Sequence, residues 1–228
     1  MRSTTCPCGA TFEGADIDAL VSQMKAHLDE AHPRWGVTAT GARNYLEAED
    51  RLTGGTERQD DIGAIEIHEA TPGRIPDVLS FFDHAGFAGN PAWAACYCVF
   101  YQNGGQDNPD WSDAKWRDNR AELEERLRKG TTTAVLAYAG RKLAAWCNAS
   151  PRTEFPSLRG RDEHPDDQVG SIVCFVVAPP YRRHGLGSKL LAAACDSFAA
   201  RGFKVAEAIP AEGDPERRRR LPRPPPPV

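Results

Sequence analysis

Residues 169–200, VGSIVCFVVAPPYRRHGLGSKLLAAACDSFAA, carry the strongest structural signal in the chain. The β-branched and aromatic residues of 172–177 are typical of a buried strand, and the two prolines at Pro179 and Pro180 end it. Residues 182–187, RRHGLG, then lead directly into an amphipathic helix. The stretch therefore predicts a strand, a glycine turn and a helix. Backbone N–H groups at such a helix start converge on an anion.

The sequence of this turn does not match two common phosphate-binding patterns. A Walker loop needs four residues between its glycines followed by Lys-Ser/Thr, which this turn lacks. A dinucleotide fingerprint needs a third glycine where Leu190 stands. Arg182 and Arg183 supply donors suited to a phosphate. The alternative is a tight βα turn that binds nothing, with solvated arginines.

The remaining pattern, Arg182-x-x-Gly185-x-Gly187 after a strand that ends in Val-x-Pro, resembles the acetyl-coenzyme A loop of the GNAT (Gcn5-related N-acetyltransferase) superfamily. The resemblance implies an α/β fold with a twisted mixed sheet, whose fourth and fifth strands, here 170–177 and 203–209, diverge. Pantetheine would bind main-chain groups between these strands, and the pyrophosphate would bind the turn. The expected coenzyme A residues are Phe175, Val176, Val177, Arg182, Arg183, His184, Gly185, Leu186, Gly187 and Ser188.

The chemistry of such a site requires an acceptor amine that has lost its proton, because an alkylammonium has no lone pair. A backbone N–H near Val176 is expected to stabilise the developing charge on the thioester oxygen. Histone-type relatives carry a glutamate base on this strand, and alignment through the turn puts Ser171 there. We expect Ser171 to hold a water molecule that relays the proton of the amine, with Asp167 supplying the negative charge. The alternative for Asp167 is a solvated acid in a loop without a catalytic role.

The rest of the main domain, residues 62–210, is predicted from periodicity as β α β α β β β α β. Its first strand is expected at 64–70, its second at 96–102, and its second helix at about 112–129. Seven cysteines in a chain without an export signal indicate thiols or metal ligands rather than disulfides. Cys96 and Cys98 are expected as buried thiols on one strand face, or else as a second metal or redox site. Core positions are expected for Cys147, Cys174 and Cys195.

The N-terminal residues 1–33 contain two thiols and two imidazoles, Cys6, Cys8, His27 and His32. These four side chains form a complete tetrahedral zinc set, and a segment this short has too little core to fold without a staple. The helix after Asp16 also resembles that of a small bacterial Cys/His module. We expect a structural zinc site, the alternative being a helix packed on the main domain with surface histidines. Residues 34–61 are expected to be a polar linker with one short helix near 44–51.

Composition limits the partners. With 28 basic and 32 acidic residues the net charge is −4, which argues against nucleic-acid binding. No apolar run reaches the ~18 residues needed to span a bilayer, and no signal peptide is recognisable, so we expect a cytoplasmic protein without a membrane partner. The Arg/Pro-rich residues 211–228 are expected to be disordered. Relatives in the GNAT superfamily continue there with a helix and two strands, for which this stretch has no counterpart. We expect that truncation or a shifted reading frame caused this difference.

These patterns predict an N-acetyltransferase that moves an acetyl group from acetyl-coenzyme A to a primary amine by direct attack. The amine belongs to a small molecule or a protein, and the pattern specifies neither the acceptor nor the oligomeric state. The alternative hypothesis is a zinc-stapled interaction protein with a degenerate, inactive acetyltransferase fold.

Overall fold

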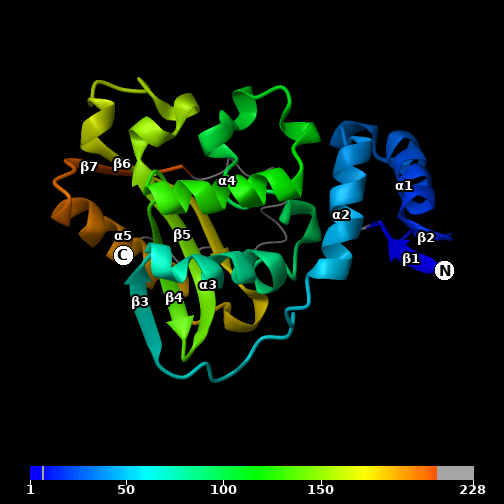
Figure 1. Ribbon diagram of the computed structural model, residues 1–228, viewed down its shortest axis with the longest axis horizontal. Helices are drawn as coiled ribbons and strands as arrows, with labels where there is room; N and C mark the ends of the chain where they lie inside the picture. Colours follow the sequence, from blue (N-terminus) through cyan, green and yellow to red (C-terminus); the bar gives the residue numbers. More distant parts are fainter. Residues whose placement is uncertain (7, 210–228) are drawn as a thin grey trace.

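A computed structural model describes residues 1–6 and 8–209 and is built around a five-stranded sheet in the order β3-β4-β5-β6-β7 (Figure 1). Strands β3 to β6 are antiparallel, whereas β7 runs parallel to β6. The predicted α/β class with a mixed sheet is confirmed. The strands are β3 (Ile65–Glu69), β4 (Ala134–Ala139), β5 (Lys142–Pro151), β6 (Val169–Val177) and β7 (Val205–Ala208).

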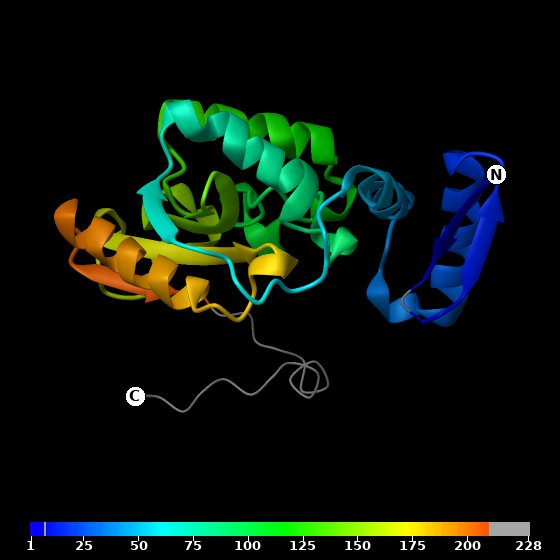
Figure 2. The same cartoon turned by 90° about the horizontal axis from the view of Figure 1, so that it is seen from below.

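Helices cover both faces of this sheet (Figure 2). One face carries α3 (Ile75–Ser80), which continues as a π-helical turn over Phe81–Ala85, and α4 (Trp116–Lys129). The other face carries α5 (Leu186–Ala200). This helix forms there because its buried residues recur on one side at four-residue spacing, so that a single apolar stripe packs on the sheet. They are Leu186, Leu190, Ala194 and Phe198.

A small N-terminal unit lies at one end of the molecule (Figure 1). It consists of a hairpin, β1 (Arg2–Thr5) and β2 (Thr11–Gly14), and of α1 (Ile17–Ala31). Asp16 caps the helix, accepting a hydrogen bond of 2.9 Å from the backbone N–H of Ala19. Four residues of α1 form most of the small core of this unit: Leu20, Val21, Met24 and Leu28.

The structure differs from the linker prediction, because α2 (Ala39–Arg51) occupies much of that segment. Its Ala42 and Leu46 pack in the core of the N-terminal unit, while its polar side chains contact the main domain. Asn44 Nδ2 donates to the carbonyl of Ala114 over 2.9 Å, and Arg51 donates to Tyr97 Oη over 2.7 Å. The helix therefore bridges the two parts of the molecule (Figure 2).

The strand predicted at 96–102 is absent, and this segment forms turns instead. Tyr97 and Cys98 have φ values of +44° and +60°, so the backbone is left-handed where a strand would be extended. Both side chains are buried nonetheless. A short apolar run signals burial but does not by itself identify a strand.

The second predicted helix begins later than expected, at Trp116 rather than near Ser112. Residues Trp111–Asp113 form a separate 3-10 turn, and extended backbone at Ala114 and Lys115 interrupts the path. The other 3-10 turns are Pro33–Trp35, Pro72–Arg74, Pro91–Trp93, Tyr101–Asn103, Gly105–Asp107, Arg152–Glu154, Pro156–Leu158, Asp166–Gln168 and Pro179–Tyr181.

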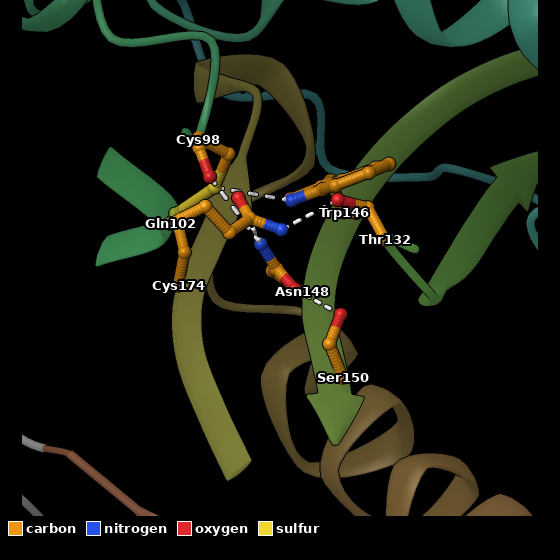
Figure 3. The surroundings of a disulfide bond; sticks show 7 residues. All are labelled: Cys98, Gln102, Thr132, Trp146, Asn148, Ser150 and Cys174. Carbon is orange, nitrogen blue, oxygen red and sulfur yellow. Dashed lines mark hydrogen bonds between the residues drawn. A yellow bond between two sulfur atoms is a disulfide. The ribbon is translucent and has the colours of Figure 1, made fainter. Parts of the chain in front are cut away.

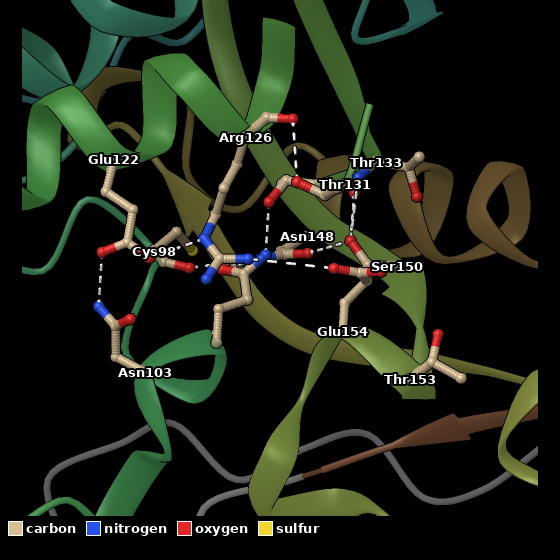
Figure 4. Close-up of polar contacts among 12 residues, drawn as sticks. Cys98, Asn103, Glu122, Arg126, Thr131, Thr133, Asn148, Ser150, Thr153 and Glu154 are labelled. Carbon is tan, nitrogen blue, oxygen red and sulfur yellow. Dashed lines mark hydrogen bonds and ion pairs between the residues drawn. The ribbon is translucent and has the colours of Figure 1, made fainter. Parts of the chain in front are cut away.

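Polar contacts join α4 to the turn at Tyr101–Asn103 and to the loop that follows β5 (Figure 4). Arg126 Nε donates to Glu122 over 2.7 Å, and the same guanidinium lies 4.0 Å from Glu154. Within β5, the buried Ser150 hydroxyl donates to Asn148 over 2.9 Å. The contact of Arg126 with Glu154 therefore links α4 to the segment that follows β5.

No helix within residues 1–6 and 8–209 is long and apolar enough to cross a membrane. The predicted disorder of the Arg/Pro tail at 211–228 concerns residues outside the described part of the chain.

Candidate coenzyme A and acceptor site

The glycine turn connects β6 to α5 and leaves the start of the helix open. Gly185 is the N-cap, with φ +74°, and no side chain caps the helix. The first amides of α5, at 186–188, have no intrahelical acceptor, as at any helix start. A Cβ built at Gly185 or Gly187 would meet nothing within 4 Å. Open space in front of unpaired N–H groups fits the approach of a phosphate.

Hydrogen bonds to neighbouring segments fix the conformation of the turn. Arg182 Nε donates to the carbonyl of Val177 over 3.0 Å, so this side chain closes the turn onto the end of β6. The backbone N–H of Gln59 donates to the carbonyl of Pro180 over 2.9 Å, and His184 Nε2 lies 2.8 Å from the carbonyl of Gln59. Arg183, at φ +66°, is exposed. The contribution of Gln59 was missed because it comes from the segment predicted as a linker.

Strands β6 and β7 pair only over part of their length. Their register joins Val169–Ile172 to Val205–Ala208, and the backbone N–H of Ile209 donates to the carbonyl of Ile172 over 3.0 Å. A register shift against β5 follows, with Val173 as the extra residue of a bulge. Within the described chain no strand pairs with this edge of β6 beyond Ile172. The divergence matches the predicted binding wedge, although β7 is shorter than the predicted 203–209.

Strand geometry decides which main-chain groups face this open edge. The N–H of Ala178 donates to the carbonyl of Ala144 on β5 over 3.0 Å, and neighbouring residues alternate in direction. The amides of Phe175 and Val177 therefore face away from β5. The amide of Val176 is directed toward β5, and the expected stabilisation of the thioester oxygen by a backbone N–H near Val176 stays a prediction.

A cavity of about 530 Å³ borders this part of β6. Its wall includes residues of β6 from Val173 to Val176, Ile209, the turns and loops at 87–114, Asn119 of α4, and Gly41 and Asn44 of α2. Six of the lining residues are aromatic: Phe87, Trp93, Phe100, Tyr101, Trp111 and Phe175. None of the described residues that line it is Asp, Glu, Lys, Arg or His. A volume of several hundred Å³ is typical of small-molecule sites.

A disulfide between Cys98 and Cys174 forms part of this wall and corrects the prediction that the cysteines are thiols (Figure 3). It joins the 96–103 segment to β6, with Cα atoms 6.6 Å apart. Trp146 Nε1 lies 3.2 Å from Cys98 Sγ, and Asn148 Nδ2 donates to the carbonyl of Cys98 over 3.3 Å. The pairing was missed because the two residues are 76 positions apart and only the fold brings them together.

The remaining cysteines of the main domain differ in their surroundings. Cys96 is a half-buried thiol that lines the cavity, and burial raises its pKa. Cys147 is buried as predicted, and burial raises its pKa to about 12. Cys195 is exposed, so its predicted core position is wrong. It lies in α5 outside the apolar stripe.

The predicted pair Ser171 and Asp167 occupies two different environments. Ser171 is fully buried, and its hydroxyl donates to Glu207 of β7 over 2.6 Å. Asp167 is exposed in the turn before β6. The carboxylate next to Ser171 is thus Glu207, which sequence reasoning missed. Only the parallel register of β6 and β7 pairs these two positions.

Arg152 fixes the loop that precedes β6. Its side chain is fully buried and donates to Asp162 over 3.0 Å and 3.1 Å. Asp166 lies 2.9 Å from Arg152 Nε, and Glu207 lies 3.7 Å from another guanidinium nitrogen. Hydrogen bonding to Asp162 raises the pKa of Arg152. A permanently charged guanidinium among three carboxylates holds Glu207 beside Ser171.

The N-terminal unit brings together the four predicted metal ligands. The ligand atoms of Cys6, Cys8, His27 and His32 all lie within 4.8 Å of one another. His32 Nε2 is buried, with no hydrogen-bond partner in the described chain, as expected for a nitrogen that binds a metal. The helix ends at Ala31, which frees His32 from helical geometry. Two thiols and two imidazoles match a structural zinc site.

A comparison with protein families identifies the family of the main domain. The sequence model of the "Acetyltransferase (GNAT) family" matches residues 92–218, more than half of the 228-residue chain. A comparison with curated protein sequences gives no match.

Similar solved structures include the aminoglycoside N-acetyltransferase AAC(6')-Iy in complex with a coenzyme A bisubstrate analogue, 15% identical, covering 69% of this chain and 86% of that chain, with a TM-score of 0.43. A GCN5-related N-acetyltransferase from Ralstonia eutropha JMP134 is 21% identical, covering 72% and 96%, with a TM-score of 0.41. A ribosomal-protein-alanine N-acetyltransferase from Brucella melitensis biovar Abortus 2308 is 14% identical, covering 69% and 87%, with a TM-score of 0.39.

Proposed function

The chain belongs to the acetyltransferase (GNAT) family, and from this we propose that it is an N-acetyltransferase that moves an acetyl group from acetyl-coenzyme A to a primary amine by direct attack. The observation that carries the proposal is the alignment of three features along β6. They are the open start of α5, the divergence of β6 from β7, and the cavity between them and α2.

Each feature has a distinct task in this proposal. The amides at 186–188 and the exposed Arg183 bind the pyrophosphate, while the outward-facing main chain of Phe175 and Val177 binds the pantetheine arm. The cavity receives the acceptor. In the reaction the amine nitrogen forms a bond to the thioester carbon, the carbon–sulfur bond breaks, the thiolate leaves with the electron pair, and the nitrogen releases one proton.

Calorimetric titration with coenzyme A tests the proposal directly. Gly187→Glu places bulk and negative charge in front of the helix start, and we expect it to weaken binding by about tenfold or more. Gly73→Glu is the matched control, because Gly73 is exposed, has open space around its Cβ and lies in another turn. If the unmodified protein binds no coenzyme A, the alternative of a degenerate, inactive fold is favoured.

The catalytic role of Ser171 and Asp167 stays a prediction. It requires that Ser171→Ala and Asp167→Asn each lower kcat by about tenfold or more and alter the pH dependence of kcat. Glu207→Gln extends this test to the carboxylate that contacts Ser171. A loss below about twofold in Asp167→Asn identifies Asp167 as a solvated loop acid.

For the N-terminal unit we propose a structural zinc ion held by Cys6, Cys8, His27 and His32. All four coordination positions would be taken by the protein, so the ion is assigned no part in acetyl transfer. Elemental analysis of the purified protein is expected to give about one zinc per chain. The double substitution Cys6→Ser with His32→Gln is expected to abolish zinc binding. Cytoplasmic location and the absence of nucleic-acid and membrane partners stay predictions.

A further inference from the structure

The lining of the cavity beside β6 has a definite chemical character. Its polar side chains are amides, hydroxyls and the Cys96 thiol, and no charged residue is among the described lining. Both lining amides already donate hydrogen bonds within the fold, since Asn44 Nδ2 donates to the carbonyl of Ala114 and Asn119 Nδ2 donates to the carbonyl of Ala95 over 2.7 Å. The remainder is dominated by six aromatic rings.

This lining disfavours a charged acceptor. An ammonium group that enters a partly closed apolar site loses its hydration and meets no carboxylate there. Aromatic faces attract a cation, but they stabilise its protonated form, which has no lone pair for attack. Desolvation also favours the neutral form of any amine. The raised pKa of Cys96 keeps that thiol neutral as well, so no thiolate compensates a cation.

The candidate proton acceptors lie outside this cavity. Ser171 is fully buried against Glu207, and Glu207 is held near Arg152. Asp167 is exposed on a separate turn. None of these residues is part of the described lining. An acceptor that arrives as the neutral amine, with its lone pair already free, needs no base at this wall before attack.

We propose that the acceptor is an aromatic amine, uncharged at neutral pH, that binds between the aromatic side chains of this cavity with its amino group toward β6. The inference rests on the proposed acetyl transfer and names its substrate class. The amino group of such a compound is unprotonated at neutral pH because its lone pair is delocalised into the ring. After attack on the thioester carbon, the new nitrogen–carbon bond makes the nitrogen strongly acidic, and its proton passes to water.

Two isomeric amines test the class. 4-Methylaniline is uncharged at pH 7, whereas benzylamine is a cation of the same composition and size. With acetyl-coenzyme A and thiol detection, we expect kcat/KM for 4-methylaniline to exceed that for benzylamine by about tenfold or more, with little pH dependence between pH 6 and 9. For benzylamine, kcat/KM should rise about tenfold per pH unit over this range, because the fraction of neutral amine rises with pH. Kanamycin and spermidine serve as polycationic acceptors.

A cavity variant supplies a second measurement. Trp93 is half exposed at the cavity, so Trp93→Ala removes an aromatic face with little loss of core packing. We expect KM for 4-methylaniline to rise about three- to tenfold. Leu191→Ala, a similarly exposed apolar residue of α5 outside the cavity lining, is the control and should leave KM unchanged.

The outcomes separate the two proposals. Preference for benzylamine, kanamycin or spermidine overturns the aromatic-amine class and leaves acetyl transfer standing. No thiol release with any amine, together with no coenzyme A binding, overturns acetyl transfer itself. If coenzyme A binds without turnover, quenching of tryptophan fluorescence decides: saturable binding of 4-methylaniline that is tighter than that of benzylamine supports the class, and no such binding overturns it.

Discussion

At the scale of single residues, Gly170 shows how closely the sheet and α5 are packed. A Cβ at this position would lie 2.5 Å from ring atoms of Phe198, which is itself buried in the α5 stripe. Gly170→Ala is expected to lower the free energy of unfolding by about 1–3 kcal/mol, because either the ring or the strand must move. Chemical denaturation measures this change.

The control for this variant is Gly73→Ala, whose Cβ would meet nothing within 4 Å. Its free energy of unfolding should differ from that of the unmodified protein by less than about 0.5 kcal/mol. Equal effects of the two substitutions would refute the close approach of α5 to β6.

Asp83 gives a residue-scale prediction on pH. Burial acts to raise the pKa of Asp83, but hydrogen bonds from Arg120 (3.0 Å) and Tyr97 (2.6 Å) outweigh it and hold the pKa below its ordinary value. A depressed folded pKa means that the stabilisation is fully present above the unfolded value of about 3.9 and is lost as pH falls through the folded pKa.

We therefore expect Asp83→Asn to cost about 1–3 kcal/mol of unfolding free energy at pH 7. The difference from the unmodified protein should shrink as pH falls below about 4. Denaturation series at several pH values check this, with Asp60→Asn at a fully exposed position as control. A difference that stays constant down to pH 2 would contradict the assigned contacts.

At the scale of elements, the disulfide ties the 96–103 turns to β6 at the cavity wall. The chain has seven cysteines, and five of them are free, so thiol titration of the unfolded protein should give five groups before reduction and seven afterwards. Reduction is expected to lower the free energy of unfolding by about 2–4 kcal/mol. A titre of seven without reductant would rule out the disulfide.

Other elements show why the sequence predicted some parts and not others. The strand, turn and helix at 169–200 were predicted because each signal is local: β-branched residues, prolines, glycines and an apolar stripe. The prediction of a strand at 96–102 was wrong because the apolar residues of this segment are buried in turns. Helix α2 was underestimated because its few apolar residues are separated by polar ones that contact the main domain.

At the scale of the whole molecule, α2 lies between the hairpin and α1 of the N-terminal unit on one side and the main domain on the other (Figure 2). The Cys/His group belongs to the N-terminal unit, whereas most of the cavity lining belongs to the main domain. Chelation of the proposed zinc ion should therefore unfold the N-terminal unit without disturbing the glycine turn. Amide hydrogen exchange should rise throughout α1, whereas affinity for coenzyme A should change by less than about twofold. A tenfold loss of affinity would instead show that α2 couples the two sites.

The sequence by itself determined the glycine turn, the helix after it, the mixed α/β class and the Cys/His ligand set, because these depend on neighbouring residues or on short spacings. Only the tertiary structure decided the disulfide between Cys98 and Cys174, the contact between Ser171 and Glu207, and the cavity beside β6, whose described lining has no charged residue. Each of these joins residues that are distant in the chain. Their proximity follows from strand register and helix packing, which local propensities do not encode.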